Sequence, residues 1–195
     1  MKTIEIKIYS FAELSEEAQQ VAIENYRQTI YEDYDLLSQF NEDANEQIKN
    51  EGWEDANLQY SLSYSQGDGL SFEAKSYNKL DEIFKEVFGQ NKEKTAQIII
   101  DNLEQCYKGN RGHYCYSSKG DIDIYLHSGA YVNKTDNIEI AIQKALLILE
   151  NRYVDLCEKL EKQGYTELEH MQTDEYIREE IEANAYEFTE DGERF

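Results

Sequence analysis

The chain contains no proline and only 10 glycines among its 195 residues. Flexible linkers between domains are rich in proline, glycine and polar residues, so this composition gives no sign of a domain boundary. Long apolar runs are absent too, since the longest is the five-residue segment 145–149, far too short to span a bilayer. We therefore expect one domain over residues 1–195 with no membrane association.

Cysteine and histidine are scarce, with three residues of each type and no Cys-x-x-Cys spacing. An odd number of unpatterned cysteines and no signal peptide are typical of a reduced, soluble, cytoplasmic protein. His113 and Cys115 share one strand face, with Cys106 upstream, but a structural zinc site requires four ligands in pairwise spacing. The sequence therefore predicts no metal site.

Catalytic signatures are also missing. The chain has no Gly-x-Ser-x-Gly or His-Glu-x-x-His motif, and the turn around Gly67 and Gly69 is not followed by the helix and Lys-Ser/Thr pair of a phosphate-binding loop. Asp121 and Asp123 share one strand face and Asp68 occupies the turn, which suits either a divalent ion or ordinary turn and solvent-facing positions. Both readings stay open for these carboxylates. We expect no catalytic residues, no cofactor and no enzymatic activity.

Negative charge is the dominant feature that is present. The chain has 41 Asp and Glu against 19 Lys and Arg, a formal net charge of −22. The excess lies in residues 12–55, with 13 acidic and 2 basic residues, and in residues 155–195, with 14 and 4, whereas residues 56–134 are nearly balanced. Self-repulsion destabilises a compact state, so folding alone does not explain two acidic segments. Such a charge also opposes direct binding to nucleic acid or anionic lipid.

The hydrophobic pattern predicts an α+β fold. Aromatic residues make up 12% of the chain, which is too many for a disordered acidic tail. Alternating apolar residues predict a strand at Ile4–Ile8 and hairpins at Leu58–Ala74 and Gly112–Leu126, the second turning at 118–120. Helical spacing predicts helices after Ser15 and at 33–50, 79–88, 92–107, 137–163 and 173–186. We expect a mostly antiparallel sheet of about five strands, burying Tyr60, Leu62, Tyr64, Phe72, Ile122, Ile124 and Leu149.

Three stretches carry a family resemblance: YSFAELSEEA at 9–18, SYSQGDGLSF at 63–72 and NAYEFTEDGERF at 184–195. Together they resemble small acidic proteins encoded by phages and prophages, whose members are often described only as hypothetical or antitoxin-like. The resemblance implies no catalytic residues. It implies a phage gene, a context in which acidic proteins often inhibit host nucleases, restriction enzymes or CRISPR effectors.

These observations lead to two functional hypotheses. In the first, the protein is an anti-defence DNA mimic in the host bacterial cytoplasm, and its carboxylates occupy the basic nucleic-acid-binding surface of a nuclease, restriction enzyme or CRISPR effector. The alternative is an antitoxin-like module that docks through a patch of Tyr31, Tyr34 and Trp53, because interface hot spots favour Tyr and Trp. The predicted partner-binding residues are Glu32, Asp33, Asp35, Glu42, Asp43, Glu46, Trp53, Asp174, Glu175, Glu179, Glu180 and Glu182.

Overall fold

A computed structural model describes residues 6–30, 37–89, 93–112, 115–127 and 136–195. The chain is an α+β protein, and its internal contacts divide it into two compact units. Unit 1 contains residues 1–39 and 165–195, and unit 2 contains residues 40–164. The prediction of one domain did not anticipate this division, because one boundary falls at Gly164 inside the continuous helix α5 (Asp136–Met171) and has no linker composition.

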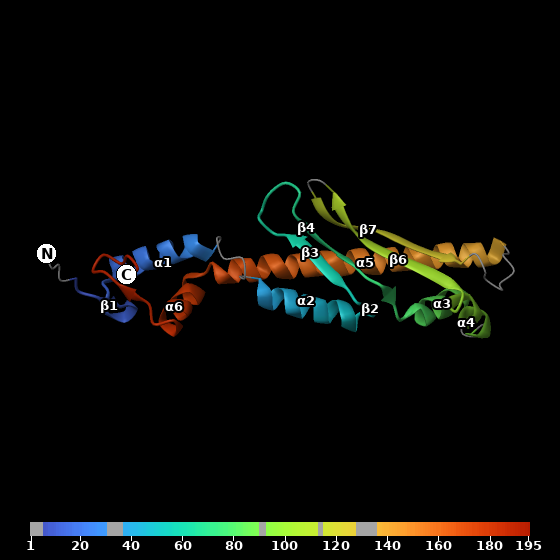
Figure 1. Cartoon of the computed structure of the whole chain (residues 1–195), viewed down its shortest axis with the longest axis horizontal. Helices are drawn as coiled ribbons and strands as arrows, with labels where there is room; N and C mark the ends of the chain where they lie inside the picture. The colour runs from blue at the N-terminus through green and yellow to red at the C-terminus, as the bar shows by residue number, and fades with distance from the viewer. Residues whose placement is uncertain (1–5, 31–36, 90–92, 113–114, 128–135) are drawn as a thin grey trace, which may run out of the picture. The chain divides into compact units, whose positions relative to one another are not determined.

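Unit 1 is built from helices that pack around a short pair of strands (Figure 1). Strand β1 (Tyr9–Ser10) pairs antiparallel with β8 (Glu187–Phe188), and helix α1 (Glu16–Ile30) contacts α6 (Asp174–Ala183). A 3-10 turn at Phe11–Glu13 and the last turns of α5 complete the unit. Its core consists of Phe11, Leu14, Ala18, Ala22, Ile23, Ile30, Ile177, Ile181 and Phe188.

The helix starts in unit 1 follow from local capping chemistry. The Ser10 N–H donates to the Glu13 carboxylate at 2.8 Å, and the Ser15 hydroxyl accepts the Ala18 N–H at 3.2 Å. At α6, the Thr173 hydroxyl accepts the Tyr176 N–H at 3.3 Å. The predicted helices after Ser15 and at 173–186 are confirmed. The predicted strand at Ile4–Ile8 is wrong over its described residues 6–8, which are irregular and exposed.

Unit 2 contains three antiparallel strand pairs, three short helices and most of the long helix α5 (Figure 1). Strand β2 (Trp53–Glu54) pairs with β5 (Ser76–Tyr77), β3 (Asn57–Ser61) with β4 (Gly69–Glu73), and β6 (Leu103–Gly112) with β7 (Cys115–Leu126). The Ala74 N–H donates to the Tyr107 carbonyl at 3.1 Å and links two of these pairs. The helices are α2 (Ser38–Asn50), α3 (Leu80–Phe88) and α4 (Glu93–Ile100).

Several expectations for unit 2 need correction. The strands form separate two-stranded sheets rather than one sheet of about five strands. The first hairpin is confirmed, but the second is longer, because β6 begins at Leu103, inside the predicted helix at 92–107, and pairs with β7 along its length. The predicted turn at 118–120 is therefore wrong, and these residues lie within β7. The apolar spacing of Leu103 and Tyr107 fits a helix and also places both residues on one strand face, so periodicity did not distinguish the two.

The core of unit 2 is a cluster of aromatic rings around Trp53. The indole lies 4.7 Å from the ring of Tyr77, 5.0 Å from Tyr107 and 5.3 Å from Phe72, measured between ring centroids. All three pairs are tilted or edge-to-face, the arrangement that aromatic quadrupoles favour. Trp53 is only 1% exposed, so its prediction as a surface anchor is wrong. Its side chain is a packing centre that contacts three strands.

The other predicted core residues have mixed outcomes. Leu62, Phe72, Ile122, Ile124 and Leu149 are buried as predicted, and Tyr60 is half-buried against Phe40, at 5.5 Å between ring centroids. Tyr64 is 58% exposed, and its predicted burial is wrong. Strand β3 ends at Ser61, and Tyr64 adopts a φ of 56° in the following turn, so the alternation of the strand stops before it reaches this side chain.

Tyr153 of α5 ties the helix to strand β4 through a buried hydroxyl. Its O–H donates to the Phe72 carbonyl at 2.7 Å and accepts the Phe72 N–H at 3.0 Å. Burial of the phenol, the largest cause, raises the pKa of Tyr153 far above its usual value, so the group stays neutral and able to donate. The hydroxyl thus satisfies the backbone donor and the backbone acceptor of one buried residue, Phe72.

Removing this hydroxyl is expected to destabilise unit 2. In Tyr153→Phe, two buried backbone groups lose their partner, which costs about 1–3 kcal/mol of unfolding free energy. Denaturant unfolding followed by the fluorescence of the single tryptophan measures the change. Tyr125→Phe, at an exposed position, is the matched control and should change stability by less than about 0.5 kcal/mol. Equal stability of the two variants would contradict a structural role for the Tyr153 hydroxyl.

Candidate acidic interaction surface

Most of the two acidic segments of the sequence lie in one compact unit. Unit 1 carries 19 Asp and Glu against 5 Lys and Arg, a formal net charge of −14 on 70 residues. Unit 2 carries 22 against 14, a net charge of −8 on 125 residues. The contacts of α1 with α6 and of β1 with β8 bring the two ends of the chain together. Unit 1 is therefore the strongly acidic part of the molecule.

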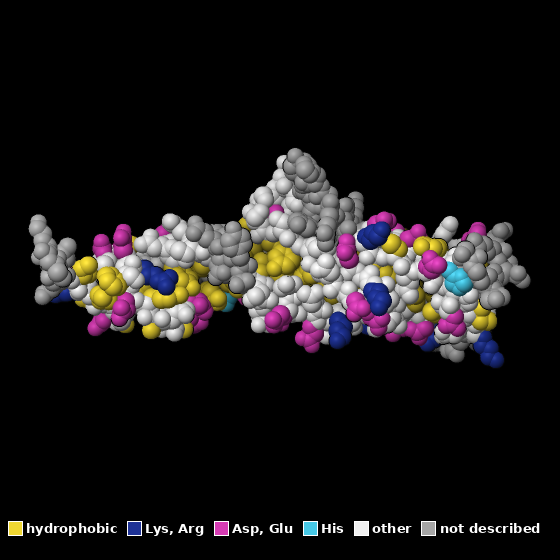
Figure 2. Space-filling model, in the orientation of Figure 1, with side chains coloured by type: hydrophobic (Ala, Val, Ile, Leu, Met, Phe, Trp, Pro, Cys, Tyr) yellow, Lys and Arg dark blue, Asp and Glu magenta, His cyan; other side chains and the backbone are white. Residues whose placement is uncertain are grey.

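Helix α6 presents an exposed stripe of carboxylates. Glu175, Glu179 and Glu182 recur at i, i+4 and i+7 and are exposed, whereas Ile177 and Ile181 of the opposite face are buried in the core. At about 1.5 Å of rise per residue, the three carboxylates extend over about 10 Å. In Figure 2, Asp and Glu side chains project from the part that carries α1 and α6 and flank exposed hydrophobic surface.

The predicted partner-binding carboxylates do not form one cluster. Glu32, Asp33 and Asp35 lie outside the described residues, as do Tyr31 and Tyr34. Glu42, Asp43 and Glu46 are exposed on α2 and belong to unit 2. Five others belong to unit 1: Asp174, Glu175, Glu179 and Glu182 are exposed, and Glu180 is half-buried.

Asp174 differs from its neighbours because it is paired. The Arg27 guanidinium contacts the carboxylates of both Asp174 and Glu24 and donates to the Gln172 carbonyl at 3.1 Å. This arrangement joins α1 to the start of α6. Asp174 therefore has a structural role in addition to its charge, and substituting it would confuse a test of partner binding.

Two other arginines of unit 1 lie against aromatic rings. The Arg194 guanidinium carbon is 3.6 Å from the centroid of the Tyr186 ring, and that of Arg178 is 5.9 Å from the centroid of Phe11. Both are cation–π distances. Arg178 is exposed on α6, three residues after Glu175 and four before Glu182, so its charge partly offsets the carboxylate stripe.

Nearby carboxylates contribute to raised pKa values of two tyrosines in unit 1, Tyr26 and Tyr176. Partial burial, the largest cause, and then Tyr186 and the Glu180 carboxylate raise the pKa of Tyr26 to about 12. Burial followed by the charges of Glu180 and Glu167 raises the pKa of Tyr176. A negative potential disfavours a further anion, which explains the direction of both charge effects.

Sequence reasoning missed other acidic residues of this surface. Described carboxylates of unit 1 that were not predicted are Glu13, Glu16, Glu17, Glu24, Glu167, Glu169, Glu187, Glu190, Asp191 and Glu193. The counts of acidic residues in segments 12–55 and 155–195 had included these residues, but no role was predicted for them individually. Only the pairing of the chain ends and the contact of α1 with α6 showed that residues 12–39 and 165–195 of these segments belong to one compact unit.

Asp68 is held by serines in the turn between β3 and β4. Its carboxylate accepts the Ser63 and Ser65 N–H groups at 2.6 and 2.9 Å and the Ser61 hydroxyl at 2.8 Å. Partial burial raises the pKa of Asp68, but the combined hydrogen bonds from these serines outweigh it and lower the pKa to about 2. The carboxylate organises the turn, which favours the turn reading of this residue.

This arrangement predicts a pH-dependent contribution to stability. Because the folded pKa of Asp68 lies below an unfolded value of about 3.9, the contribution is complete above that value and is lost as the pH falls toward about 2. Asp68→Asn should therefore be less stable than the native protein at pH 7, and the difference should shrink steadily below pH 4. Thermal melts across this range measure it, with Asp123→Asn, at an exposed position, as the control. A difference that is constant with pH would contradict the assignment.

No group of three or more His, Cys, Asp or Glu side chains suited to a metal ion occurs among the described residues. Of the zinc candidates, His113 lies outside them, the side chain of Cys115 is likewise undescribed, and Cys106 is a half-buried free thiol. Asp121 and Asp123 are exposed on β7. Cys157 is fully buried, and burial, the largest cause, raises its pKa to about 12, so this thiol is protonated and unreactive.

Within the described part of the chain, helices fall short of the length and apolarity needed to cross a membrane. Comparisons with protein-family models, with curated proteins and with solved structures found no match to this chain.

Proposed function

We propose that this protein is a non-enzymatic inhibitor that uses the acidic surface of unit 1 to occupy the basic nucleic-acid-binding surface of a bacterial nuclease, restriction enzyme or CRISPR effector. The observation that carries the proposal is that residues 12–39 and 165–195, parts of the two acidic segments, join in one unit of net charge −14. Carboxylates on a rigid helix stand in for phosphates and attract the Lys and Arg side chains that normally bind nucleic acid. The resemblance to phage-encoded acidic proteins fits this role.

The carboxylate stripe of α6 would form the centre of the contact. Its exposed side chains stand on a helix whose opposite face is anchored in the core, so they need little reordering on binding. Charge complementarity of this kind accelerates association and makes affinity depend steeply on salt. An antitoxin-like protein that docked through an aromatic patch would show a weak salt dependence. The burial of Trp53 removes the tryptophan on which that alternative rested.

The target is identified by affinity capture with the full-length protein. Bacterial lysate is passed over the immobilised protein at low salt, and bound proteins are eluted by a salt gradient and identified. We expect a nucleic-acid-binding enzyme that elutes as salt rises and that no longer binds DNA while in the complex. A ternary complex of enzyme, DNA and inhibitor would contradict mimicry.

Charge reversal on α6 provides the decisive variant. Glu175→Lys, Glu179→Lys and Glu182→Lys together should weaken binding to the captured enzyme by about 100-fold, from three lost attractions of about 1 kcal/mol each. Glu82→Lys, Glu150→Lys and Glu158→Lys change the net charge equally but lie at exposed positions of unit 2. This control should bind within a few-fold of the native protein. Equal losses in the two triple variants would show that net charge, and not the unit 1 surface, governs binding.

A further inference from the structure

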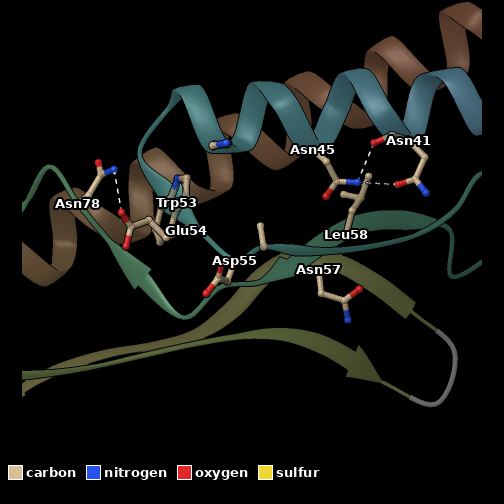
Figure 3. Close-up of a pocket in the computed structure, with 10 residues that line it drawn as sticks. Asn41, Asn45, Trp53, Glu54, Asp55, Asn57, Leu58 and Asn78 are labelled. Atoms are coloured by element: carbon tan, nitrogen blue, oxygen red, sulfur yellow. Dashed lines mark hydrogen bonds between the residues drawn. The ribbon is translucent and has the colours of Figure 1, made fainter.

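The groove of unit 2 between helix α2 and residues 53–58 is lined by polar groups that already have partners (Figure 3). The Asn45 amide donates to the main-chain and side-chain oxygens of Asn41 at 2.7 and 2.9 Å. The Glu54 carboxylate accepts the Ser76 hydroxyl at 2.6 Å. Main-chain groups without a partner among the described residues occur instead in unit 1, at the edge of its small sheet.

The sheet of unit 1 has one covered edge and one open edge. Strand β8 pairs with β1 on one side and with the C-terminal residues 193–195 on the other. The Thr189 N–H donates to the Glu193 carbonyl, and the Phe195 N–H donates to the Glu187 carbonyl, each at 2.9 Å. Among the described residues, β1 pairs with β8 alone. The outer edge of β1 is therefore the open edge of the sheet.

The hydrogen-bond pattern shows which residues point their main-chain groups at the open edge. In an antiparallel ladder, the groups of successive residues point to opposite edges. Glu187 and Thr189 bond to the C-terminal residues, so the main-chain groups of Phe188 point to its partner Tyr9. The groups of Tyr9 therefore point to β8, and those of Ser10 point outward, where its N–H meets a capping carboxylate at 2.8 Å. By the same alternation, every even-numbered residue of an extended segment before β1 points to the open edge.

Ile6 and Ile8 immediately precede β1 and carry apolar side chains that are 55% and 41% exposed. The main chain of residues 6–8 forms no hydrogen bond with another described residue. In the sequence, the alternation of isoleucine with charged residues continues back to Ile4, which lies outside the described residues. An apolar strand pattern at an open edge is a template for pairing with another chain.

The sequence around Ile6 is complementary to itself in antiparallel pairing. If two copies pair about Ile6, Glu5 of each copy lies opposite Lys7 of the other. Ile4 then lies opposite Ile8, and the isoleucines occupy the positions whose main-chain groups point to the open edge. Pairing about residue 5 or 7 would instead oppose two Glu5 or two Lys7 side chains, which destabilises a sheet. Charge complementarity therefore favours a second copy of this chain at the edge.

We propose that residues 4–8 form a self-association site, through which two copies of the protein pair antiparallel about Ile6. The β1–β8 pairs of both copies then join in one sheet, with about six main-chain hydrogen bonds between the copies. Residues 1–11 carry two lysines and one glutamate, so this contact avoids the acidic side chains that dominate unit 1. Five residues a side form a small interface, which is typical of a weak dimer. The proposal does not depend on the inhibitory function proposed above.

Sedimentation equilibrium of the full-length protein tests the self-association. A monomer–dimer equilibrium is expected between about 10 μM and about 1 mM protein. Each copy carries a net charge of −22, so raising NaCl from about 50 to about 500 mM should screen the repulsion and increase the dimer fraction. Binding to a basic enzyme would show the opposite salt dependence, so the two proposals fail separately. A protein that stays monomeric throughout these ranges would overturn the self-association.

A charge-reversal cycle tests the register. Lys7→Glu should weaken the dimer about 30-fold, because two cross-strand attractions become two repulsions, and Glu5→Lys should weaken it similarly. An equimolar mixture of the two variants should associate about as well as the native protein, since opposite charges again face each other. Lys94→Glu makes the same change in net charge at an exposed position of unit 2 and should leave the dimer within a few-fold of native. No recovery in the mixture would exclude pairing about Ile6.

Amide hydrogen exchange, followed by NMR as the protein concentration is raised, identifies the edge that pairs. The Ile6 and Ile8 amides should become protected in the dimer, because their N–H groups point to the other copy. The Lys7 amide points away from the other copy and should continue to exchange rapidly. Equal protection of all three amides, or of none in a confirmed dimer, would overturn pairing through the open edge of β1.

Discussion

Replacing Trp53 by alanine is expected to produce the largest loss of stability of any single substitution in unit 2. The indole is 1% exposed and contacts the rings of Phe72, Tyr77, Tyr107 and Tyr153. Truncating a buried tryptophan leaves a large cavity and costs about 3–5 kcal/mol. Because domains are stabilised by only about 5–15 kcal/mol, a large fraction of the variant should be unfolded well below the native melting temperature. Thermal melts by circular dichroism measure this loss.

The control separates the core role of Trp53 from a surface role. Tyr64→Ala removes an aromatic side chain that is 58% exposed and should change stability by less than about 1 kcal/mol. Trp53→Phe should recover part of the stability lost in Trp53→Ala, since a smaller ring still fills most of the site. An unchanged melt for Trp53→Ala with a loss of partner binding would instead support the surface anchor that the sequence suggested.

The second large effect is expected in unit 1, at Gly192. Its φ is 87°, a conformation that side chains with a Cβ rarely adopt, and a Cβ at this position would lie 2.1 Å from the Ala18 carbonyl oxygen. That atom belongs to the backbone of α1 and cannot rotate away. Gly192→Ala should therefore displace the C-terminal segment from α1 and cost about 3 kcal/mol or more, combining strain with overpacking. Hydrogen exchange of the α1 and α6 amides measures the loss.

Gly89 supplies the matched control for this prediction. It also has a positive φ, 74°, but a Cβ there would meet no atom within 4 Å. Gly89→Ala therefore reports the cost of backbone conformation alone, and the excess loss in Gly192→Ala reports the steric clash. If the two variants lose equal stability, the close approach of Gly192 to α1 is not present in solution.

The same two variants measure how far the units fold together. The sequence predicted one domain, and that statement about cooperativity stays a prediction. If the protein unfolds as one domain, there is a single unfolding transition that both units share. Trp53→Ala and Gly192→Ala should then each lower its midpoint temperature. Separate transitions, each shifted by the variant in its own unit, would show two domains connected through helix α5.

Local sequence signals were sufficient wherever a residue acts on its near neighbours. The helix starts near Ser15 and Thr173 depend on hydroxyls that cap amide groups three residues away. The hairpin of β3 and β4 depends on a glycine-containing turn between two alternating strands. The exposure of Glu175, Glu179 and Glu182 follows from helical spacing relative to Ile177 and Ile181. These features required no knowledge of distant contacts.

Tertiary structure decided what depends on residues far apart in the chain. The four-residue spacing of Leu103 and Tyr107 is compatible with a helix or with a strand. Pairing with β7 stabilises this segment as a strand. Trp53 stands beside two acidic residues, which suggested a surface position, but rings from four other elements enclose it. The sequence by itself determined the acidic character of the protein and the helices and turns with local caps. Only the pairing of the chain ends brought residues 12–39 and 165–195 of the acidic segments into one unit, because like charges repel and burial of apolar residues from both parts had to hold them together.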